Sequence, residues 1–534
     1  MNRSVVVMAF CTAALVSTAA PSAQPCGSLA QVTLPNNTTI TLATPVAAGQ
    51  FTPPDGTAVT VPAFCRVSGV ARPTADSEIK FEVWLPNAWN GRFDQGGNGG
   101  YGRGFNVPGG FMIGALNRGY AVAGTDMGHP RTFGYDVTWA IGHPEKLNDW
   151  AYRANHVTAQ NAKAIIRAYY GEFARFSYFT GCSDGGHEAL MEAQRFPDDF
   201  DGIIGGALAN NWTRQSAGHI WQGTALIDAG FTASKLALVA KASVAACDGL
   251  DGIVDGLIED PRRCSFDPAV LQCKNADAPD CLTAAQVDAV RKNYAGPRNP
   301  RTGELVYPGV ERGGEALWTF VMPPTPGGIG LPFYRDLVFA NPAWDMHTLD
   351  YDRDVALGDA RFGPIINSTD PDLRDFRDLG GKFIMYHGWS DQAINPRNSV
   401  NYLNSVADFF ARHERGGHKR GERKDVSSFI RLFMIPSMPH CLGGPGVNTF
   451  DALTALERWV EDGIAPESIR ASNAGLGLGP NVMSAAPGTL SRPLCAYPKV
   501  ARWTGKGGTS DAANFRCVKP EKADGDDDDR DDDG

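Results

Sequence analysis

The chain has 534 residues, of which 43% are apolar and 20% charged, an ordinary composition for a globular protein larger than one average domain. Its net charge is −10, but the tail from Glu521 holds nine acidic and two basic residues, so seven of these charges lie there. The rest of the chain is close to neutral, which excludes the basic face that nucleic-acid binding requires. We expect residues 521–534 to be disordered, because dense like charges repel and nothing apolar is present to bury.

Residues 1–23 have the pattern of a signal peptide. Arg3 precedes an apolar run that ends at Val16, and small residues follow it. Cleavage after Ala20 and cleavage after Ala23 fit equally well. The apolar run is too short to span a bilayer as a helix, and no later stretch is long enough. We therefore predict an exported protein, secreted or periplasmic, with no membrane anchor.

The following segments alternate between strand and helix patterns. Residues 79–86 (IKFEVWLP) alternate apolar and polar positions, which predicts a strand, and residues 120–126 read as a buried strand. Residues 155–170 have apolar positions at helical spacing and predict a helix that stops at Gly171. This alternation favours an α/β fold with a parallel sheet.

The stretch from Gly181 to Gly185 reads Gly-Cys-Ser-Asp-Gly. A short aromatic strand is predicted before it at 176–179, and strong helix formers follow it at 188–194. A strand, a tight turn and a helix with a serine at the apex form a nucleophile elbow. In a chain with 61 glycines the motif could arise by chance, but the flanking elements argue against that. Ser183 is therefore the predicted nucleophile.

A serine nucleophile needs a base, and the base needs a carboxylate that orients it. Folds built on this elbow place them in the chain order Ser, acid, His. Asp391 follows an apolar predicted strand at 382–386, and His440 follows another at 429–435. Both lie just beyond the C-terminal ends of strands, where such a sheet carries its site. We predict Asp391 as the acid and His440 as the base, and we expect His387 to line the pocket.

A glycine-rich loop at 95–102 (QGGNGGYG) follows an early strand. Hydrolases of this kind place the second oxyanion donor there, as a backbone N–H. We assign this donor to Gly99, with the N–H of Asp184 as its partner. A phosphate-binding turn is the alternative, but no Lys-Ser/Thr or dinucleotide pattern follows the loop.

Cys182 directly precedes the predicted nucleophile and Cys441 directly follows the predicted base, so a disulfide between them would join the two. With this arrangement the chain resembles the tannase and feruloyl esterase family, whose hallmark is a Cys-Ser…Asp…His-Cys constellation. The matching stretches are 181–186, 387–391 and 439–441, and the resemblance extends over nearly the whole mature chain. It implies an α/β-hydrolase core, a lid with a structural calcium ion, and activity on esters of aromatic acids.

From Asn210 to about Pro364 the chain is rich in Pro, Gly and Trp and shows no clear strand alternation. An unstructured loop of this length is implausible inside a compact domain. We therefore predict a lid domain at 210–364, inserted into a discontinuous catalytic core formed by residues 24–209 and 365–520.

The predicted lid contains an acidic, glycine-rich turn (CDGLDGIVDGLIED, 247–260). Its hard oxygen ligands suit calcium rather than zinc, although the spacing is not that of an EF-hand. An acidic turn without an ion is the alternative. The calcium pattern of the family maps onto the side chains of Asp248, Asp251 and Asp255 and onto the backbone carbonyls of Ile253 and Leu257.

Eleven cysteines are present, and removal of Cys11 with the signal peptide leaves ten. An even number in an exported chain points to disulfides, with some free structural thiols as the alternative. Proximity and the family resemblance together suggest the pairs Cys26–Cys65, Cys182–Cys441, Cys247–Cys264, Cys273–Cys281 and Cys495–Cys517.

We therefore predict an exported serine carboxylic-ester hydrolase that acts through an acyl-enzyme on small aromatic esters: feruloyl, galloyl or terephthalate half-esters. It would bind structural Ca²⁺ and need no organic cofactor. The alternatives are a serine peptidase of the same fold and a non-catalytic binding protein on a hydrolase fold. Trp344, Trp389 and Phe333 are candidates for stacking on the acyl group, with plain packing as the alternative. Arg312 and Arg335 are candidate partners for a terephthalate carboxylate, and the sequence indicates no oligomeric state.

Overall fold

The computed structural model of the chain describes residues 24–54, 56–102, 104–130, 135–413, 425–473 and 489–520. The predicted signal peptide and the predicted disordered tail lie outside these ranges.

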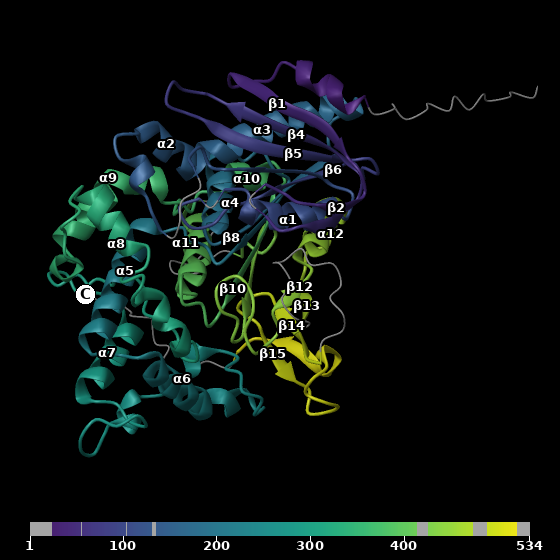
Figure 1. Cartoon of the computed structure of the whole chain (residues 1–534). Helices are drawn as coiled ribbons and strands as arrows, with labels where there is room; N and C mark the ends of the chain where they lie inside the picture. Colours follow the sequence, from purple (N-terminus) through teal and green to yellow (C-terminus); the bar gives the residue numbers. More distant parts are fainter. Residues whose placement is uncertain are drawn as a thin grey trace, which may run out of the picture.

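A nine-stranded mixed sheet forms the centre of the fold, in the order β1-β4-β5-β7-β6-β8-β9-β10-β11 (Figure 1). Neighbours from β7 to β11 pair in parallel, whereas β1, β4, β5 and β7 pair with one another antiparallel. The strands are β1 (Thr38–Val46), β4 (Phe64–Ala71), β5 (Ile79–Pro86), β6 (Arg92–Gly96), β7 (Ala121–Thr125), β8 (Phe176–Cys182), β9 (Gly202–Gly206), β10 (Lys382–Gly388) and β11 (Ile430–Ile435). Strands such as β7 and β10 are almost entirely buried, which is why their sequences are nearly continuous apolar runs.

Helices cover the sheet between its strands. They are α1 (Asn106–Leu116), α2 (Pro144–Asn148), α3 (Ala154–Tyr170), α4 (Asp184–Arg195), α10 (Arg374–Asp378), α11 (Arg397–His413) and α12 (Ala452–Asp462). Helix α3 ends where the sequence predicts, because Gly171 adopts a left-handed conformation with φ of 80°. Asp451 begins α12 by accepting the backbone N–H of Thr454.

The segment between β9 and β10 contains helices and no named strand. Its helices are α5 (Trp212–Asp228), α6 (Ala233–Cys247), α7 (Ala284–Ala295), α8 (Gly330–Pro332) and α9 (Arg353–Ile366), and Figure 1 shows α5, α6 and α7 gathered beside the sheet. A hydrophobic cluster that includes Leu236, Val290 and Trp318 lies within this segment. The predicted lid boundary at residue 364 falls inside α9.

Shorter sheets complete the fold. They are the hairpin of β2 (Gly49–Phe51) and β3 (Val59–Val61), the sheet of β12 (Thr449–Phe450), β13 (Ser468–Ser472) and β14 (Ser491–Cys495), and the ribbon of β15 (Val500–Trp503) and β16 (Phe515–Val518). The structure contains the five predicted disulfides. Among the described residues no single helix is long and apolar enough to span a membrane, and α5 with α6 pass that test only as a pair bent by 109°.

Candidate active site

Ser183 lies between β8 and α4 in a strained backbone conformation. Its φ is 68° and its ψ is −119°, a combination that costs energy for a residue with a side chain and that nucleophile elbows share. The turn is possible because two of its neighbours are glycines. A Cβ on Gly181 would collide with the backbone of Gly185, and a Cβ on Gly186 would collide with the carbonyl of Gly206.

His440 and Asp391 come from two other segments of the chain and lie in line with Ser183. His440 Nε2 lies 2.8 Å from Ser183 Oγ, and His440 Nδ1 lies 2.8 Å from Asp391 Oδ2. Because Nδ1 faces a carboxylate, it carries the ring proton, which leaves Nε2 free to accept the serine hydroxyl. The structure therefore brings the three predicted residues into one hydrogen-bonded chain.

A disulfide lies beside these three residues and joins Cys182 to Cys441, whose Cα atoms are 6.0 Å apart. It links the residue before Ser183 to the residue after His440. Like Ser183, Cys441 has a positive φ, of 66°. The predicted nucleophile and the predicted base are thus joined covalently through their immediate neighbours.

Asp391 is held as an ion by its surroundings. Its Oδ1 accepts the backbone N–H groups of Ala393 at 2.8 Å and Ile394 at 2.9 Å. Burial by itself raises the pKa of Asp391, but the charge and hydrogen bonds of His440 and His387 outweigh burial and leave the pKa lowered. The carboxylate can therefore orient His440 and balance a positive charge on it.

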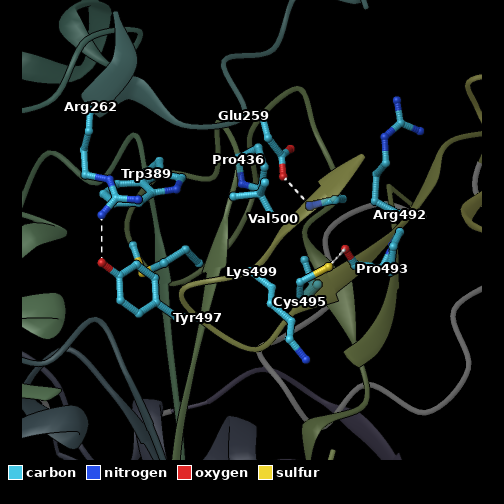
Figure 2. Close-up of a pocket in the computed structure, with 13 residues that line it drawn as sticks. Glu259, Arg262, Trp389, Pro436, Arg492, Pro493, Cys495, Tyr497, Lys499 and Val500 are labelled. Atoms are coloured by element: carbon cyan, nitrogen blue, oxygen red, sulfur yellow. Dashed lines mark hydrogen bonds between the residues drawn. The ribbon is translucent and has the colours of Figure 1, made fainter. Parts of the chain in front are cut away.

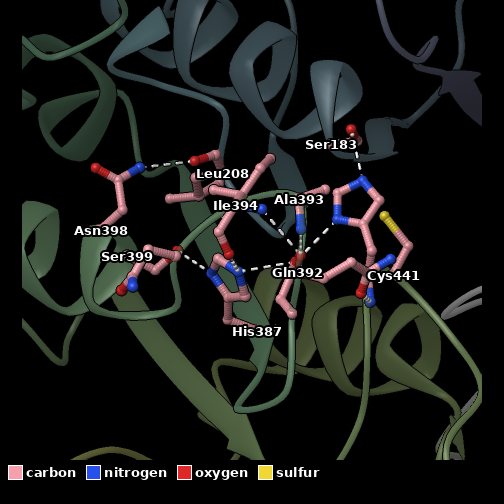
Figure 3. Close-up of polar contacts among 12 residues, drawn as sticks. Ser183, Leu208, His387, Gln392, Ala393, Ile394, Asn398, Ser399 and Cys441 are labelled. Carbon is pink, nitrogen blue, oxygen red and sulfur yellow. Dashed lines mark hydrogen bonds and ion pairs between the residues drawn. The ribbon is translucent and has the colours of Figure 1, made fainter. Parts of the chain in front are cut away.

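A second histidine, His387, lies beneath the same carboxylate (Figure 3). Its Nε2 is 3.1 Å from Asp391 Oδ2 and 3.1 Å from the carbonyl of Ile394, so Nε2 carries the proton; its Nδ1 is 2.7 Å from Ser399 Oγ. We expected His387 to line the pocket, but its side chain is completely buried. In the sequence His387 stands four residues before Asp391. This spacing is the signal that indicates a residue supporting Asp391 rather than one that contacts the substrate.

The glycine-rich loop is tied to α4 through Asn98, a residue that the sequence analysis missed. The N–H of Asn98 donates to Glu188 Oε2 at 2.9 Å, and its carbonyl accepts the N–H of Gly185 at 3.0 Å. Its side-chain Oδ1 accepts the N–H of Gly99 at 2.9 Å. The predicted oxyanion donor Gly99 is thus already hydrogen-bonded, and it must share or exchange this bond to serve an oxyanion. Asp184 is the first residue of α4, where a helix leaves backbone N–H groups free.

Residues 65–518 match the profile of the family described as tannase and feruloyl esterase. The chain belongs to this family. An uncharacterised esterase of Xanthomonas campestris pv. campestris is 40% identical, over 95% of this chain and 93% of the relative. Mono(2-hydroxyethyl) terephthalate hydrolase of Piscinibacter sakaiensis is 33% identical, over 88% of this chain and 87% of the relative. The crystal structure of feruloyl esterase B from Aspergillus oryzae has 30% sequence identity and a TM-score of 0.82, over 92% of this chain and 99% of that one.

These similarities confirm two predictions from the sequence. The core of the protein is an α/β-hydrolase-type fold, and the protein is a carboxylic ester hydrolase.

In this esterase the acidic turn gathers three carboxylates around its own backbone. Asp248 accepts the N–H groups of Asp255 and Gly256, at 3.0 and 2.9 Å, and Asp251 accepts that of Ile253 at 2.9 Å. Burial, together with the negative charges of Asp255 and Asp248, raises the pKa of Asp251. Arg492 pairs with Asp255 at 2.8 Å. Three carboxylates on one tight turn are a donor set of the kind that fits a hard cation such as Ca²⁺.

All three predicted stacking side chains of the esterase pack against other side chains of the protein. Phe333 is 0% exposed and packs edge-to-face against Phe362. The ring of Trp389 lies 5.1 Å from the guanidinium of Arg262, at a small pocket between the insertion and the C-terminal strands (Figure 2). This pocket has a volume of about 20 Å³, which is room for water and not for an aromatic acid. Trp344 is partly buried and packs on Phe339.

The two candidate arginines are also engaged. Arg335 donates two hydrogen bonds to the carboxylate of Asp336, each 2.7 Å long. Arg312 donates to the carbonyl of Phe266 and lies 4.3 Å from the ring centre of Tyr294. Arg335 is thus held in a two-bonded pair with Asp336, whereas Arg312 commits its Nε to a backbone carbonyl.

Proposed function

We propose that this protein is an exported serine esterase that hydrolyses esters of aromatic carboxylic acids through an acyl-enzyme. The observation that carries the proposal is the chain from Ser183 through His440 to Asp391, with hydrogen bonds of 2.8 and 2.8 Å. This complete chain also favours a catalyst over a binding protein on the same fold.

The geometry supports a two-step reaction. Ser183 Oγ attacks the ester carbonyl while its proton passes to His440 Nε2, and Asp391 balances the charge that forms on the imidazole. Backbone N–H groups at Asp184 and in the loop at 95–102 bind the developing oxyanion. His440 then returns the proton to the leaving alcohol, which departs and leaves the acyl group on Ser183.

Water completes the cycle by the same steps in reverse. His440 removes a proton from the water molecule, whose oxygen attacks the acyl carbonyl. Collapse of the second tetrahedral intermediate returns the proton to Ser183 Oγ and releases the carboxylic acid. The residues of the chain suffice for both steps, so the proposal includes no organic cofactor.

The substrate class rests on the relatives. One is named for hydrolysis of a terephthalate half-ester and another for feruloyl esters, and both acids are aromatic. We therefore propose feruloyl, galloyl or terephthalate half-esters as substrates.

Calcium has a structural part in this proposal. Asp248, Asp251 and Asp255 would hold it, with the backbone carbonyls of Ile253 and Leu257, and a bound ion supplies positive charge to a turn rich in carboxylates. The turn lies in the insertion, between α6 and α7, and contributes no residue to the hydrogen-bonded chain at Ser183.

Export is supported by the disulfides. Five bridges within one chain are typical of oxidising compartments, which agrees with a leader at residues 1–23. Mass spectrometry of the protein from the outside or periplasm of its host tests this, because the mature chain should begin after Ala20 or Ala23.

Ser183→Ala tests the catalytic assignment. We expect a folded protein whose kcat on a ferulate, gallate or terephthalate half-ester falls several thousand-fold, about the loss seen when a triad nucleophile is removed. The exposed Ser428→Ala is the matched control and should keep wild-type kcat. A serine-directed covalent inhibitor should label wild type and control once and leave Ser183→Ala unlabelled.

Unchanged turnover by Ser183→Ala would refute the serine mechanism. A peptide amide in the same panel separates the alternative activity, because a peptidase of this fold would cleave it with a kcat/KM comparable to that of the esters.

A further inference from the structure

Three side chains with metal-binding chemistry meet away from the proposed active site, where α3 lies near the end of α4. They are His156 of α3, Glu192 of α4 and Asp199 of the turn before β9. One ligand atom from each lies within 4.8 Å of the other two. Glu192 comes nine residues after Ser183, which is about 13 Å along a helix.

Glu192 is the member of this cluster that lacks a partner. Its side chain is 1% exposed, and among the described residues neither carboxylate oxygen has a hydrogen-bond donor. Burial, followed by the charge of Asp199 and direct contact with it, raises the pKa of Glu192 well above its ordinary range. Two carboxylates that face each other in a buried place need either a shared proton or a cation between them.

The nearby basic side chain, Lys163, contacts Asp199. The ammonium of Lys163 lies 3.6 Å from Asp199 Oδ1 and donates to the backbone carbonyl of the same residue. His156 Nδ1 lies 2.5 Å from the other oxygen, Asp199 Oδ2. The charge of Lys163 also acts to lower the pKa of Glu192, but burial and the contact with Asp199 outweigh it, so Glu192 is the less compensated of the two carboxylates.

The chemistry of the cluster selects the kind of cation. One imidazole and two carboxylates suit Zn²⁺ and related first-row ions, whereas calcium takes six or more oxygen ligands. The side chain of His156 is 23% exposed, so an ion can enter from solvent. Gln160 Nε2 contacts His156 Nε2 at 3.0 Å, and Gln160 Oε1 accepts from Asn36 Nδ2 at 2.7 Å. A histidine that binds metal through Nδ1 carries its proton on Nε2, so the amides of both Gln160 and Asn36 rotate to accept it.

We propose that His156, Glu192 and Asp199 form a binding site for a divalent transition-metal ion of the zinc type, with water completing the coordination. The ion replaces the proton that the two carboxylates would otherwise share. It ties α3 to α4, the helix that begins directly after Ser183, and it is distinct from the calcium turn.

Zinc binding to chelator-treated protein tests this proposal. Calorimetric titration with Zn²⁺ is carried out in excess Ca²⁺, which occupies the acidic turn and competes poorly for imidazole. We expect one site in wild type, with affinity at least tenfold weaker in Glu192→Gln and in His156→Gln. The exposed neighbour Asp198→Asn is the matched control and should bind zinc like wild type. Zinc should raise the melting temperature of wild type and of Asp198→Asn only.

The variants remain informative because Glu192→Gln has the size and neutrality of the protonated acid and so folds without metal. Circular dichroism establishes folding in each variant, independently of esterase activity. Co²⁺ gives a second readout, since visible absorption bands should appear in wild type and be absent from Glu192→Gln. Equal zinc affinity in wild type and Glu192→Gln, or no binding by either, would overturn the proposal and show that the two carboxylates share a proton.

Discussion

Glu188 provides a test of how α4, the helix that begins directly after Ser183, positions the glycine-rich loop at 95–102. It accepts the N–H of Asn98 at 2.9 Å, and both side chains are only 1% exposed. Burial, and then the charge of Asp184, raises the pKa of Glu188 well above its ordinary range, which favours the neutral acid. Glu188→Gln therefore preserves size, charge and the accepting oxygen. Glu188→Leu instead leaves the N–H of Asn98 buried without an acceptor.

The expected loss follows from these contacts. A buried N–H without a partner costs about 1–3 kcal/mol, and the loop can recover it only by moving. Movement of the loop removes an oxyanion donor, which lowers kcat by about 100- to 1000-fold. We therefore expect Glu188→Leu to lose on the order of 100-fold in kcat with KM nearly unchanged, and Glu188→Gln to stay within about threefold of wild type.

The assay is steady-state hydrolysis of a small chromogenic acetate, with melting measured in parallel by circular dichroism. Full kcat in Glu188→Leu together with a lower melting temperature would show that the contact stabilises the fold and does not position the loop. Equal losses in the two variants would show that a negative charge at this position matters and would refute the reasoning from a neutral acid.

Four further predictions concern other residues of the structure. His387→Ala should lower kcat about tenfold or more, because the proposed catalytic carboxylate loses a buried hydrogen bond; unchanged kcat at saturating substrate would make this histidine a packing residue. Replacing Cys182 and Cys441 together by Ala should lower kcat by on the order of 100-fold per folded molecule, since a displacement of the reacting groups by about 1 Å has that effect. Full activity at a lower melting temperature would show that the disulfide only stabilises the fold. Burial raises the pKa of Asp94 from 3.8 to about 8, so between these pH values the folded state keeps a proton that the unfolded chain has lost. The free energy of unfolding in urea should therefore fall from pH 4 to pH 8, and it should fall less steeply in Asp94→Asn than in wild type. Identical slopes in the two proteins would contradict this. Calcium should raise the melting temperature of wild type but not of Asp251→Ala, while the pH–rate profile stays the same; a shift in that profile would place the ion near the reaction.

Features that depend on residues close together in the chain could be predicted from the sequence. The strand at 79–86 has the predicted bounds, since its alternating pattern is typical of a strand, although the structure buries both faces and exposes only Lys80. The end of α3 at Gly171 was accessible for a similar reason, since glycine adopts the left-handed conformation that closes a helix. Ser183 was identified by its two flanking glycines and by the elements on either side of it, all within about twenty residues.

Contacts between distant segments were decided only by the tertiary structure. His387 and Asp391 are four residues apart and equally buried, but which of the two contacts His440 depends on how β10 and the turn after it pack against their neighbours. The bond from the N–H of Asn98 to Glu188 joins residues 90 positions apart, whereas the N–H of Gly99 donates to the side chain of its immediate neighbour Asn98. The burial of Phe333 is of the same kind. A motif states which groups are present near a site, whereas the direction in which each group points is determined by packing against residues that the motif does not contain.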